Sequence, residues 1–515
     1  VNWLDTEIKA NSSRPDTVGN EAPYTPEYTA NIGVDVTVPI TDRMDFFANL
    51  NGRWTGETWF HTVQAGQRPT IFMPLFDIVT EKGLDLVPVP TAQQVGMTLG
   101  GRYLAFNLFE RRHGGDPAEP RLYLIQCAPL FERQGQVYTE HDDEHVRWGF
   151  FQRAVVESLQ RLQWSPQILH LNDWTTALIP LLLKRLYAWD QLFADTRTVM
   201  TIHNLGYQGG FIAATIDDLD LRGVADAFDQ AELAGGGVNW LRTGLSMVDR
   251  ITTVSPTYAQ EIQTPEFGYG LDGLLRERGD AIVGILNGID EEAWDPKLDP
   301  HLPRRFGPQD VWRRRGNKLE LLRRMGLPED PDTILYGLIA RLTSQKGIDL
   351  LEEVLPAFLG ERPARLVVLG SGEARYETFF ANLVERFPSR VGYSRGYDEP
   401  LAHHIEGGSD VFLMPSRYEP CGLNQMYSQR YGALPLVHRT GGLADTVDPI
   451  VDGSGQGFVF DEYSAAALRA ALDRSVEVWS QPERWAEAMD RGMRRHFGWG
   501  DRAEDYGEVY RDLLR

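Results

Sequence analysis

The sequence predicts an α/β protein made of two doubly wound domains, each with a mainly parallel sheet at its centre. Three observations predict this fold class. Short apolar runs alternate with helical patterns in two separate stretches of the chain, which is typical of βαβ units. The length of 515 residues exceeds the ~250–300 residues that one hydrophobic core accommodates. A segment rich in proline and charge, 293–328, separates the two stretches.

The first stretch contains three short apolar runs that predict buried strands. They are expected over 167–170, 198–202 and 250–254. A helix is expected over 175–187, after the first of these strands. Ser255 and Pro256 predict another helix start, because serine caps helices and proline suits their first turn.

The second stretch predicts a further parallel sheet. Its strands are expected over 334–339, 365–369, 410–414 and 435–437. Helices are expected to begin near Gly347 and Gln425, and 499–515 has the apolar spacing of an amphipathic helix. We therefore expect two Rossmann-like domains that face a cleft, at 1–290 and 291–497, followed by a terminal helix at 498–515.

The composition is that of a water-soluble globular protein, with 42% hydrophobic and 24% charged residues. The 51 basic and 73 acidic residues give a net charge of −22, which argues against nucleic acid as a partner. No apolar run approaches the ~20 residues that span a bilayer, so no membrane partner is expected. Cys127 and Cys421 lie far apart and form no metal-ligand spacing, which favours a reducing cytoplasm.

Charged residues follow two strands of the second stretch. Ligands of parallel sheets bind outside the carboxyl ends of the strands. Arg341 and Lys346 lie in such a loop beside a helix N-terminus, where a diphosphate is stabilised by charge and free N–H groups. Glu419 follows the strand 410–414 and can meet a polar ligand there. The alternative is that all three side chains are solvated surface charges.

The first stretch places Asp173 and His203 at strand ends, where both are expected to project towards the cleft. A histidine at a strand end is also commonly a structural hydrogen-bonding residue. Asn287 precedes a glycine, a pair that by itself predicts a turn. Two glycine-containing turns, 370–372 and 440–442, follow strands and allow backbone N–H groups to approach phosphate.

Several of these strings resemble one known family. The strings RLTSQKGID, SRYEPCGLNQ and HRTGGLADTV, together with HLNDW, TIHNLGYQG and ILNGID, resemble bacterial glycogen synthases and plant starch synthases, glycosyltransferase family 5. The resemblance extends from about residue 137 to the C-terminus. It implies the GT-B fold, with an acceptor-side first domain, a nucleotide-sugar-binding second domain and a last helix that returns to the first domain.

The resemblance also implies a reaction. Glucose would move from ADP-glucose to the non-reducing end of an α-1,4-glucan, with retention of configuration and without a metal ion or other cofactor. Such an enzyme is expected in the cytoplasm, or in the plastid of a plant or alga. The base of the donor, the length of the acceptor and the oligomeric state stay open.

Residue roles follow from the same resemblance. Arg341 and Lys346 would bind the diphosphate, and Glu419 would contact the transferred glucose, with His203 and Asp173 near the same sugar. The further substrate-binding residues implied are Asn204, Asn287, Gly370, Gly372, Tyr397, Cys421, Gly422, Leu423, Thr440, Gly441 and Gly442. Of these, Cys421 is expected to pack beneath its loop and is given no catalytic role.

The beginning of the chain departs from the family. Members open with an apolar strand and a Lys-x-Gly-Gly-Leu loop whose lysine binds donor phosphate. Here 6–8 would correspond to the end of that strand, and the following residues include Lys9 and Arg14 without that motif. This departure favours one alternative, a catalytically weak glucan- or nucleotide-binding homologue with a regulatory role. A separate alternative, a metal-dependent transferase or a sugar-nucleotide epimerase, also stays open.

Overall fold

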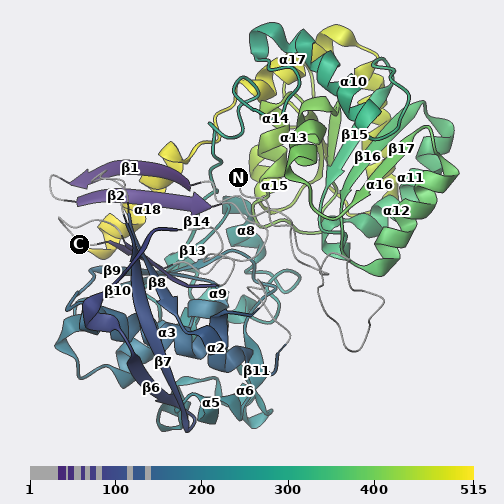
Figure 1. Cartoon of the computed structure of the whole chain (residues 1–515). Coiled ribbons are helices and arrows are strands. Elements are labelled where there is room, and N and C mark those ends of the chain that lie inside the picture. The colour runs from purple at the N-terminus through teal and green to yellow at the C-terminus, as the bar shows by residue number, and fades with distance from the viewer. Residues whose placement is uncertain are drawn as a thin grey trace, which may run out of the picture. The chain divides into compact units, whose positions relative to one another are not determined.

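A computed structural model describes residues 33–41, 44–51, 60–63, 70–76, 84–112, 120–133 and 141–515 (Figure 1). These residues form two compact units. We call the unit made of 255–258 and 286–499 the C-terminal unit, and the unit made of 33–254, 259–285 and 500–515 the N-terminal unit. The expectations for 6–8, Lys9 and Arg14 lie outside the described residues.

The N-terminal unit is built on a ten-stranded sheet with a parallel centre. The order along it is β14-β13-β10-β9-β3-β4-β8-β7-β5, and β6 pairs with β7. The parallel neighbours at one end are β14 (Ile282–Gly284), β13 (Arg250–Thr253), β10 (Arg197–Ile202) and β9 (Ile168–Asn172). The next strands are β3 (Phe60–Val63), β4 (Thr70–Pro74), β5 (Leu86–Pro88), β6 (Val95–Leu99), β7 (Arg102–Arg111) and β8 (Arg121–Gln126).

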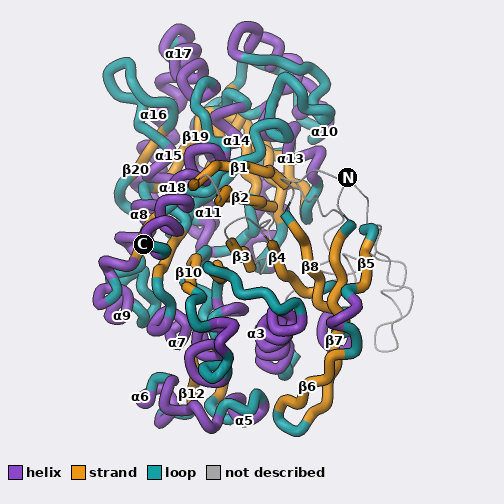
Figure 2. The backbone as a smooth tube through the Cα atoms, turned by 90° about the vertical axis from the view of Figure 1, so that its left-hand side faces the viewer, coloured by secondary structure: helices purple, strands orange, loops and turns teal. Residues whose placement is uncertain are grey.

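Two small antiparallel pairs complete the strands described in this unit. They are β1 (Gly33–Thr41) with β2 (Met44–Asn51), and β11 (Gly210–Ile212) with β12 (Gly237–Asn239). β6 and the first half of β7, which pair with each other, extend away from the rest of the sheet, while the second half of β7 pairs with β8 and β5 (Figure 2). The strands predicted over 167–170, 198–202 and 250–254 are confirmed as β9, β10 and β13, with ends that differ by one or two residues.

Helices cover the parallel part of this sheet. The α-helices of the unit are α2 (Ala128–Phe131), α3 (Glu144–Arg161), α4 (Ile179–Leu181), α5 (Thr215–Asp218), α6 (Gln230–Ala234), α7 (Trp240–Met247), α9 (Asp272–Glu277) and α18 (Trp499–Leu513). The short 3-10 helices are Pro90–Ala92, Trp174–Thr176, Gln191–Phe193, Arg222–Ala227 and Gly279–Ala281. Helix α8 (Pro256–Glu261) begins in the C-terminal unit, at the proline predicted to start it.

The continuous helix predicted over 175–187 is wrong. The chain forms a 3-10 turn at 174–176, then α4, then a π-helix at Leu182–Leu186. Pro180 has no N–H to donate to the carbonyl of Thr176, so a regular α-helix through this segment would lose a hydrogen bond. The spacing of apolar residues on which the predicted helix was based indicates only which side chains are buried. The buried residues here are Leu178, Ile179, Leu181 and Leu182.

The last helix, α18, packs in the N-terminal unit. Tyr506, Val509 and Tyr510 are buried, as the predicted apolar face requires. The hydroxyl of Tyr510 lies 2.6 Å from His170 Nδ1 of β9. A buried hydrogen bond thus links residues that are 340 positions apart in the sequence.

The C-terminal unit contains one six-stranded sheet in which all strands are parallel. Its order is β17-β16-β15-β18-β19-β20, which in chain order is 3-2-1-4-5-6, the order of dinucleotide-binding folds. The strands are β15 (Ile334–Ile339), β16 (Ala364–Gly370), β17 (Val391–Arg395), β18 (Val411–Met414), β19 (Leu434–His438) and β20 (Phe458–Phe460). The four predicted strands of this stretch, and the α/β fold class, are confirmed.

The helices of this unit lie on both faces of the sheet. They are α10 (Arg314–Arg324), α11 (Ile348–Glu361), α12 (Ala374–Arg386), α13 (Glu399–Gly408), α14 (Asn424–Arg430), α15 (Gly441–Thr446), α16 (Ala465–Trp479) and α17 (Pro482–Met493), with 3-10 turns at Pro308–Arg313 and Ser344–Lys346. The predicted starts near Gly347 and Gln425 are confirmed by α11 and α14.

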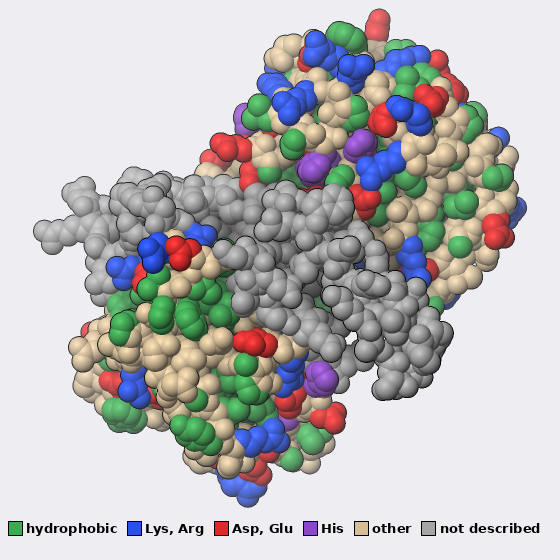
Figure 3. Space-filling view, in the orientation of Figure 1, with side chains coloured by type: hydrophobic (Ala, Val, Ile, Leu, Met, Phe, Trp, Pro, Cys, Tyr) green, Lys and Arg blue, Asp and Glu red, His purple; other side chains and the backbone are tan. Residues whose placement is uncertain are grey.

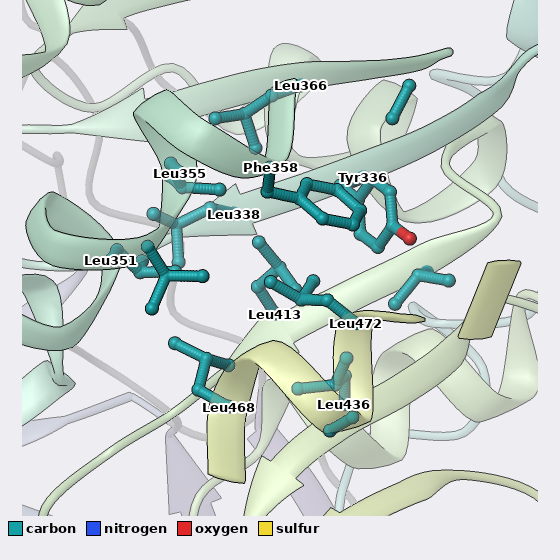
Figure 4. Close-up of a cluster of buried hydrophobic side chains, with 14 of the residues drawn as sticks. Tyr336, Leu338, Leu351, Leu355, Phe358, Leu366, Leu413, Leu436, Leu468 and Leu472 are labelled. Atoms are coloured by element: carbon teal, nitrogen blue, oxygen red, sulfur yellow. The ribbon is translucent and has the colours of Figure 1, made fainter. Parts of the chain in front are cut away.

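Burial on both faces explains why the strands of this sheet are continuous apolar runs. Tyr336 and Leu338 point into one core cluster, with Phe358 of α11 and Leu472 of α16 (Figure 4). Leu335, in the same strand, belongs to the cluster on the opposite face. Successive side chains of a strand alternate between faces, so one strand contributes to both clusters.

Two further observations concern the described residues as a whole. None of their helices combines the length and apolarity needed to cross a membrane. On the face shown in Figure 3, Lys and Arg side chains are interspersed with Asp and Glu side chains and do not gather in one patch.

Candidate active site

The strand order of the C-terminal unit reverses between β15 and β18. These strands are parallel neighbours, yet the chain continues from β15 to one side and from β18 to the other. In doubly wound sheets, the crevice at the carboxyl ends of such a strand pair binds the ligand. Here the loop 340–347 follows β15, and the loop 415–423 follows β18.

The two loops are joined by an ion pair. Lys346 Nζ donates to Glu419 Oε2 at 2.7 Å, and Ser416 Oγ donates to the same oxygen at 3.0 Å. Glu419 is 6% exposed. Among the residues that the structure describes, none donates a hydrogen bond to the other carboxylate oxygen, Oε1. The carboxylate is therefore oriented through one oxygen, and the second oxygen stays available for a ligand.

Arg341 and Arg417 lie in the same two loops but differ in their contacts. Arg341 is exposed and has no ion-pair partner in the described part of the chain. Arg417 Nη2 lies 2.9 Å from Asp349 Oδ2, and its guanidinium lies 4.3 Å from the ring centroid of Tyr463. Arg341 is thus the cation of this pair that can neutralise an incoming anion without breaking an existing contact.

Gly347 allows the two loops to approach each other. Its φ of +73° lies in the left-handed region, and a Cβ there would overlap the carbonyl oxygen of Pro415. Glycine alone satisfies both conditions at low cost. The residue separates Lys346 from the first turn of α11, so its conformation also determines where Lys346 leaves the backbone.

The glycines of the two predicted phosphate-binding turns, 370–372 and 440–442, pack tightly against neighbouring loops. The N–H of Gly442 donates to the carbonyl oxygens of Glu419 at 3.1 Å and Pro420 at 3.2 Å. The N–H of Gly372 donates to the carboxylate of Glu377 at 3.0 Å. A Cβ at Gly370 would overlap the carbonyl oxygen of Ala340. These contacts position the loops, and the predicted phosphate contacts of Gly370, Gly372, Gly441 and Gly442 stay a prediction.

Gln425, which the sequence argument did not assign to the site, holds the loop that carries Glu419. Its side-chain amide donates to the carbonyl oxygens of Cys421 at 3.1 Å and Gly422 at 3.0 Å, and to Thr446 Oγ1 at 3.0 Å. Gln425 is fully buried. A polar residue in the first turn of a helix directly after the loop was the only local signal for this role.

The start of α8 holds the same loop from another side. Ser255 Oγ donates to the carbonyl of Pro420 at 2.7 Å and accepts from the N–H of Tyr258 at 3.1 Å, so its predicted capping role is confirmed. Thr257 Oγ1 donates to Asp445 Oδ1 of α15 at 2.7 Å. The first bond holds the backbone directly after Glu419, and the second joins the start of α8 to α15.

The other predicted residues of the C-terminal unit occupy loops at strand ends. Tyr397 follows β17 and Asn287 follows β14, and both are partly buried. Cys421 is buried, as expected of a residue packed beneath its loop. Gly422 has a φ of +72°, and Leu423 and Thr440 flank α14 and α15. The ligand contacts implied for these residues stay a prediction.

In the N-terminal unit, Asp173 and His203 lie at the carboxyl ends of the parallel neighbours β9 and β10. The N–H of His203 donates to Asp173 Oδ1 at 2.8 Å, and His203 Nε2 donates to Asn172 Oδ1 at 2.8 Å. Asn204 uses its side-chain oxygen to accept from the N–H of Gly206 at 3.0 Å. The structure thus brings Asp173, His203 and Asn204 together at one edge of the sheet.

Asp173 has an unusual backbone. Its φ of 56° and ψ of −174° are rarely adopted by residues other than glycine. Burial raises the pKa of its carboxyl, while the charge of His203 and the N–H groups of His203 and Asn204 act in the opposite direction. Strained backbone and a shifted pKa cluster at functional sites, so both observations favour a functional role for Asp173.

Within the residues that the structure describes, no group of three or more His, Cys, Asp or Glu side chains has the arrangement of a metal site. Arg341 and Lys346 are the two cationic side chains in the loop after β15.

The sequence is similar to those of known proteins. The sequence matches the family profile described as starch synthase catalytic domain over 61–277, and that described as glycosyl transferases group 1 over 318–491. It is 40% identical to the glycogen synthase of Syntrophotalea carbinolica over 454 residues, covering 87% of this chain and 92% of that protein. It is 46% identical to the glycogen synthase of Myxococcus xanthus over 373 residues, covering 72% and 77%.

Solved structures show the same fold. The catalytic domain of Starch Synthase IV from Arabidopsis thaliana, bound to ADP and acarbose, has a TM-score of 0.78 and 31% identity, with 86% of this chain and 92% of that chain covered. A sucrose-phosphate synthase from Thermosynechococcus elongatus has a TM-score of 0.51 at 19% identity, covering 79% and 85%, and is similar in fold alone.

Proposed function

This chain belongs to the glycogen and starch synthase family of glycosyltransferases, and we propose that it transfers glucose from ADP-glucose to the non-reducing end of an α-1,4-glucan. Family membership makes it a glucan synthase with the GT-B fold. The observation that carries the finer proposal is the Lys346–Glu419 ion pair at the reversal of strand order. The ADP bound to the Arabidopsis domain supports an adenine nucleotide as part of the donor.

In the proposed reaction, Arg341 and Lys346 stabilise the departing diphosphate. The bond from the anomeric carbon of glucose to the diphosphate oxygen breaks, and negative charge develops on that oxygen. Positioned cations at a helix N-terminus stabilise this charge more in the transition state than in the ground state. The two side chains thereby supply positive charge at the diphosphate. We propose that turnover therefore requires no metal ion.

Glu419 is proposed to act on the glucose itself. Ser416 and Lys346 orient its carboxylate through Oε2, and Oε1 is placed to accept from sugar hydroxyls or to stabilise positive charge at the anomeric carbon. His203, Asp173 and Asn287 are proposed to hold the same glucose, as the family resemblance implies. We propose that retention results from a front-face displacement: the acceptor oxygen bonds to the anomeric carbon from the side that the diphosphate leaves, and the acceptor's hydroxyl proton passes to the departing diphosphate oxygen.

The first experiment measures turnover without free metal ions. The purified chain is incubated with ADP-glucose, glycogen and excess EDTA, and ADP release is compared with glucose incorporation into glycogen. Equal amounts are expected. A parallel reaction with UDP-glucose tests the base of the donor. Loss of activity in EDTA, restored by a divalent ion, would contradict the proposed metal independence.

The second experiment tests the assigned residues. Lys346→Ala and Glu419→Ala are expected to nearly abolish transfer. Each is also expected to lower the unfolding temperature, because it leaves the other charge largely buried without its partner. Asp490→Ala is a matched control, because it removes a 2.7 Å ion pair with Arg494 that lies on the surface. Transfer by both Lys346→Ala and Glu419→Ala at the rate of Asp490→Ala would contradict the site assignment.

A second candidate function is favoured by one observation, the absence of the Lys-x-Gly-Gly-Leu motif near the start of the chain. Hydrogen bonds to charged groups contribute ~1.5–3 kcal/mol each, so loss of that lysine would weaken donor binding. A catalytically weak glucan-binding homologue is therefore the alternative. It predicts a folded protein that binds glycogen and turns over neither ADP-glucose nor UDP-glucose.

A further inference from the structure

His203 is held at two places by two consecutive residues at the end of β9. Its backbone N–H donates to Asp173 Oδ1 at 2.8 Å, and its ring atom Nε2 lies 2.8 Å from Asn172 Oδ1. Asn172 is the last residue of β9, and His203 directly follows β10, the parallel neighbour of that strand (Figure 1). Asp173 therefore positions the backbone of His203, whereas Asn172 contacts its imidazole ring.

The contact with Asn172 determines which ring nitrogen of His203 carries the proton. A neutral imidazole has one N–H group, and its second nitrogen is an acceptor. Asn172 Oδ1 is an amide oxygen that can only accept, so the proton lies on Nε2. The hydrogen bond of one ring nitrogen thus sets the state of the other. In the neutral ring, Nδ1 of His203 is unprotonated.

The backbone around Asn172 fixes the place of its amide. The hydroxyl of Thr176 donates to the carbonyl of Asn172 at 3.0 Å, and the N–H of Asp173 donates to the carbonyl of Thr201 at 3.0 Å. The strained φ of 56° at Asp173 turns the chain directly after Asn172. The side chain of Asn172 is also buried. The amide is therefore held beside the ring and can select one tautomer.

The other ring nitrogen of His203 is available to a ligand. His203 is partly exposed, and Nδ1 has no hydrogen-bond partner among the residues that the structure describes. An unprotonated Nδ1 accepts a hydrogen bond, and a sugar hydroxyl can donate one. A doubly protonated ring would present an N–H at the same place and would add a positive charge.

An amide suits this role better than a carboxylate does. A carboxylate beside Nε2 favours the charged imidazolium, in which both ring nitrogens are donors. The amide of Asn172 accepts the same hydrogen bond and carries no charge. Asp173 is the titratable residue whose charge interacts with His203 in the described part of the chain, and its carboxylate accepts from backbone N–H groups.

We propose that Asn172 is a positioning residue, which holds His203 in the Nε2–H tautomer so that Nδ1 accepts a hydrogen bond from a hydroxyl of the transferred glucose. The identity of the sugar rests on the proposed function. Without the amide, the ring is free to rotate and to change tautomer. The sugar hydroxyl would then meet an N–H in a fraction of the molecules, and transfer would slow.

The first test measures the tautomer directly and needs no turnover. Spectra of ¹⁵N are recorded on protein labelled at histidine, at about pH 8, above the ordinary histidine pKa of ~6.5. The chain has 11 histidines, so the signals of His203 are identified as those missing from His203→Gln. Protonated and unprotonated ring nitrogens have well-separated shifts, and correlations to the ring C–H protons distinguish Nδ1 from Nε2.

The parent protein is expected to show a protonated Nε2 and an unprotonated Nδ1 at His203. A protonated Nδ1 in the parent would overturn the proposal. This result does not depend on the activity of the protein or on the folding of any Asn172 variant.

Three variants test the effect on transfer. Asn172→Leu removes the acceptor and keeps a branched side chain of similar size. Asn172→Asp keeps an acceptor at the same place and adds a charge that favours the imidazolium. Asn107→Leu is the matched control, because Asn107 Oδ1 accepts from the N–H of Gln94 at 2.8 Å in the same unit, on β7. Initial rates with ADP-glucose and glycogen are measured from about pH 6 to about pH 9, on both sides of the ordinary histidine pKa.

Asn172→Leu is expected to lower kcat/KM by about 10–100-fold at every pH, as loss of the group that orients a histidine does in metal sites. Asn172→Asp is expected to be impaired at low pH and to recover as pH rises, because the neutral ring regains an unprotonated Nδ1. A rate of Asn172→Leu equal to that of Asn107→Leu would overturn the proposal. A pH profile of Asn172→Asp parallel to that of the parent would also overturn it.

Two further outcomes are distinguishable from these. If Asn172→Leu does not fold, the tautomer of the parent and the pH profile of Asn172→Asp decide the proposal. Failure of the parent chain to transfer glucose would contradict the proposed function instead, and the spectra would still test the role of Asn172.

Discussion

Lys346 and Glu419 are joined by a 2.7 Å ion pair, although 73 positions separate them in the sequence. Both side chains are largely buried, at 19% and 8% exposure, so neither charge is fully solvated. A diphosphate bound at the helix N-terminus would compete with Glu419 for the ammonium group. Each residue therefore determines where the other lies, and donor binding is expected to change both.

This coupling predicts that changes at the two residues are not additive. Lys346→Ala and Glu419→Gln are each expected to lower kcat/KM by about 10²–10³, as removal of a charge-stabilising group does. The double variant is expected to lose less than the product of the two, with an interaction energy of ~1–3 kcal/mol. The measurement is a double-mutant cycle on initial rates with ADP-glucose and glycogen. Strict additivity would contradict the functional coupling.

Gly347 provides a test of loop geometry. Gly347→Ala is expected to destabilise the protein and lower transfer, because a Cβ would overlap the carbonyl oxygen of Pro415 in addition to the strain of a φ of +73°. Gly453→Ala is the matched control, with a φ of +80° and no atom within 4 Å of the added Cβ. Thermal unfolding and initial rates are measured for both. Equal losses would show that the left-handed φ alone, and not the close approach of the loops, requires glycine.

Glu406 predicts a pH-dependent contribution to stability. It is 1% exposed, neither carboxyl oxygen has a hydrogen-bond partner among the described residues, and burial raises its pKa well above the ordinary value despite the charge of Arg314. A group with a raised pKa in the folded state stabilises the protein at low pH, and this contribution is lost as pH rises through that pKa.

The corresponding variant is Glu406→Gln, which keeps the shape and cannot ionise. Its unfolding temperature relative to the parent is expected to increase from about pH 5 to about pH 9. Glu385→Gln, at an exposed position of α12, serves as the control. A difference between Glu406→Gln and the parent that does not change with pH would contradict the prediction.

Tyr510 predicts a contribution of the terminal helix to the N-terminal unit. Tyr510→Phe is expected to lower the free energy of unfolding by ~1–2 kcal/mol, because His170 Nδ1 would lose its buried partner at 2.6 Å. The measurement is urea unfolding. Tyr103→Phe is the control, since Tyr103 is 73% exposed. A midpoint for Tyr510→Phe that equals the control would show that packing alone holds the helix.

The sheet of the C-terminal unit was predictable from the sequence because its strands are buried on both faces. Continuous apolar runs such as 334–339 leave a local signal that needs no knowledge of the fold. The helix over 175–187 was mispredicted for the same reason. Apolar spacing reports burial, and it does not distinguish an α-helix from a 3-10 turn followed by a π-helix around Pro180.

By itself, the sequence determined the fold class and the strand ends that carry Arg341, Glu419 and His203. Its motifs also determined the family. Only the tertiary structure decided that Lys346 pairs with Glu419, that Gln425 holds the loop and that Asp173 has a strained backbone. The physical reason is the distance along the sequence over which each interaction acts. Strand and helix signals arise between neighbouring residues, whereas these contacts join segments whose distance depends on how every element between them packs.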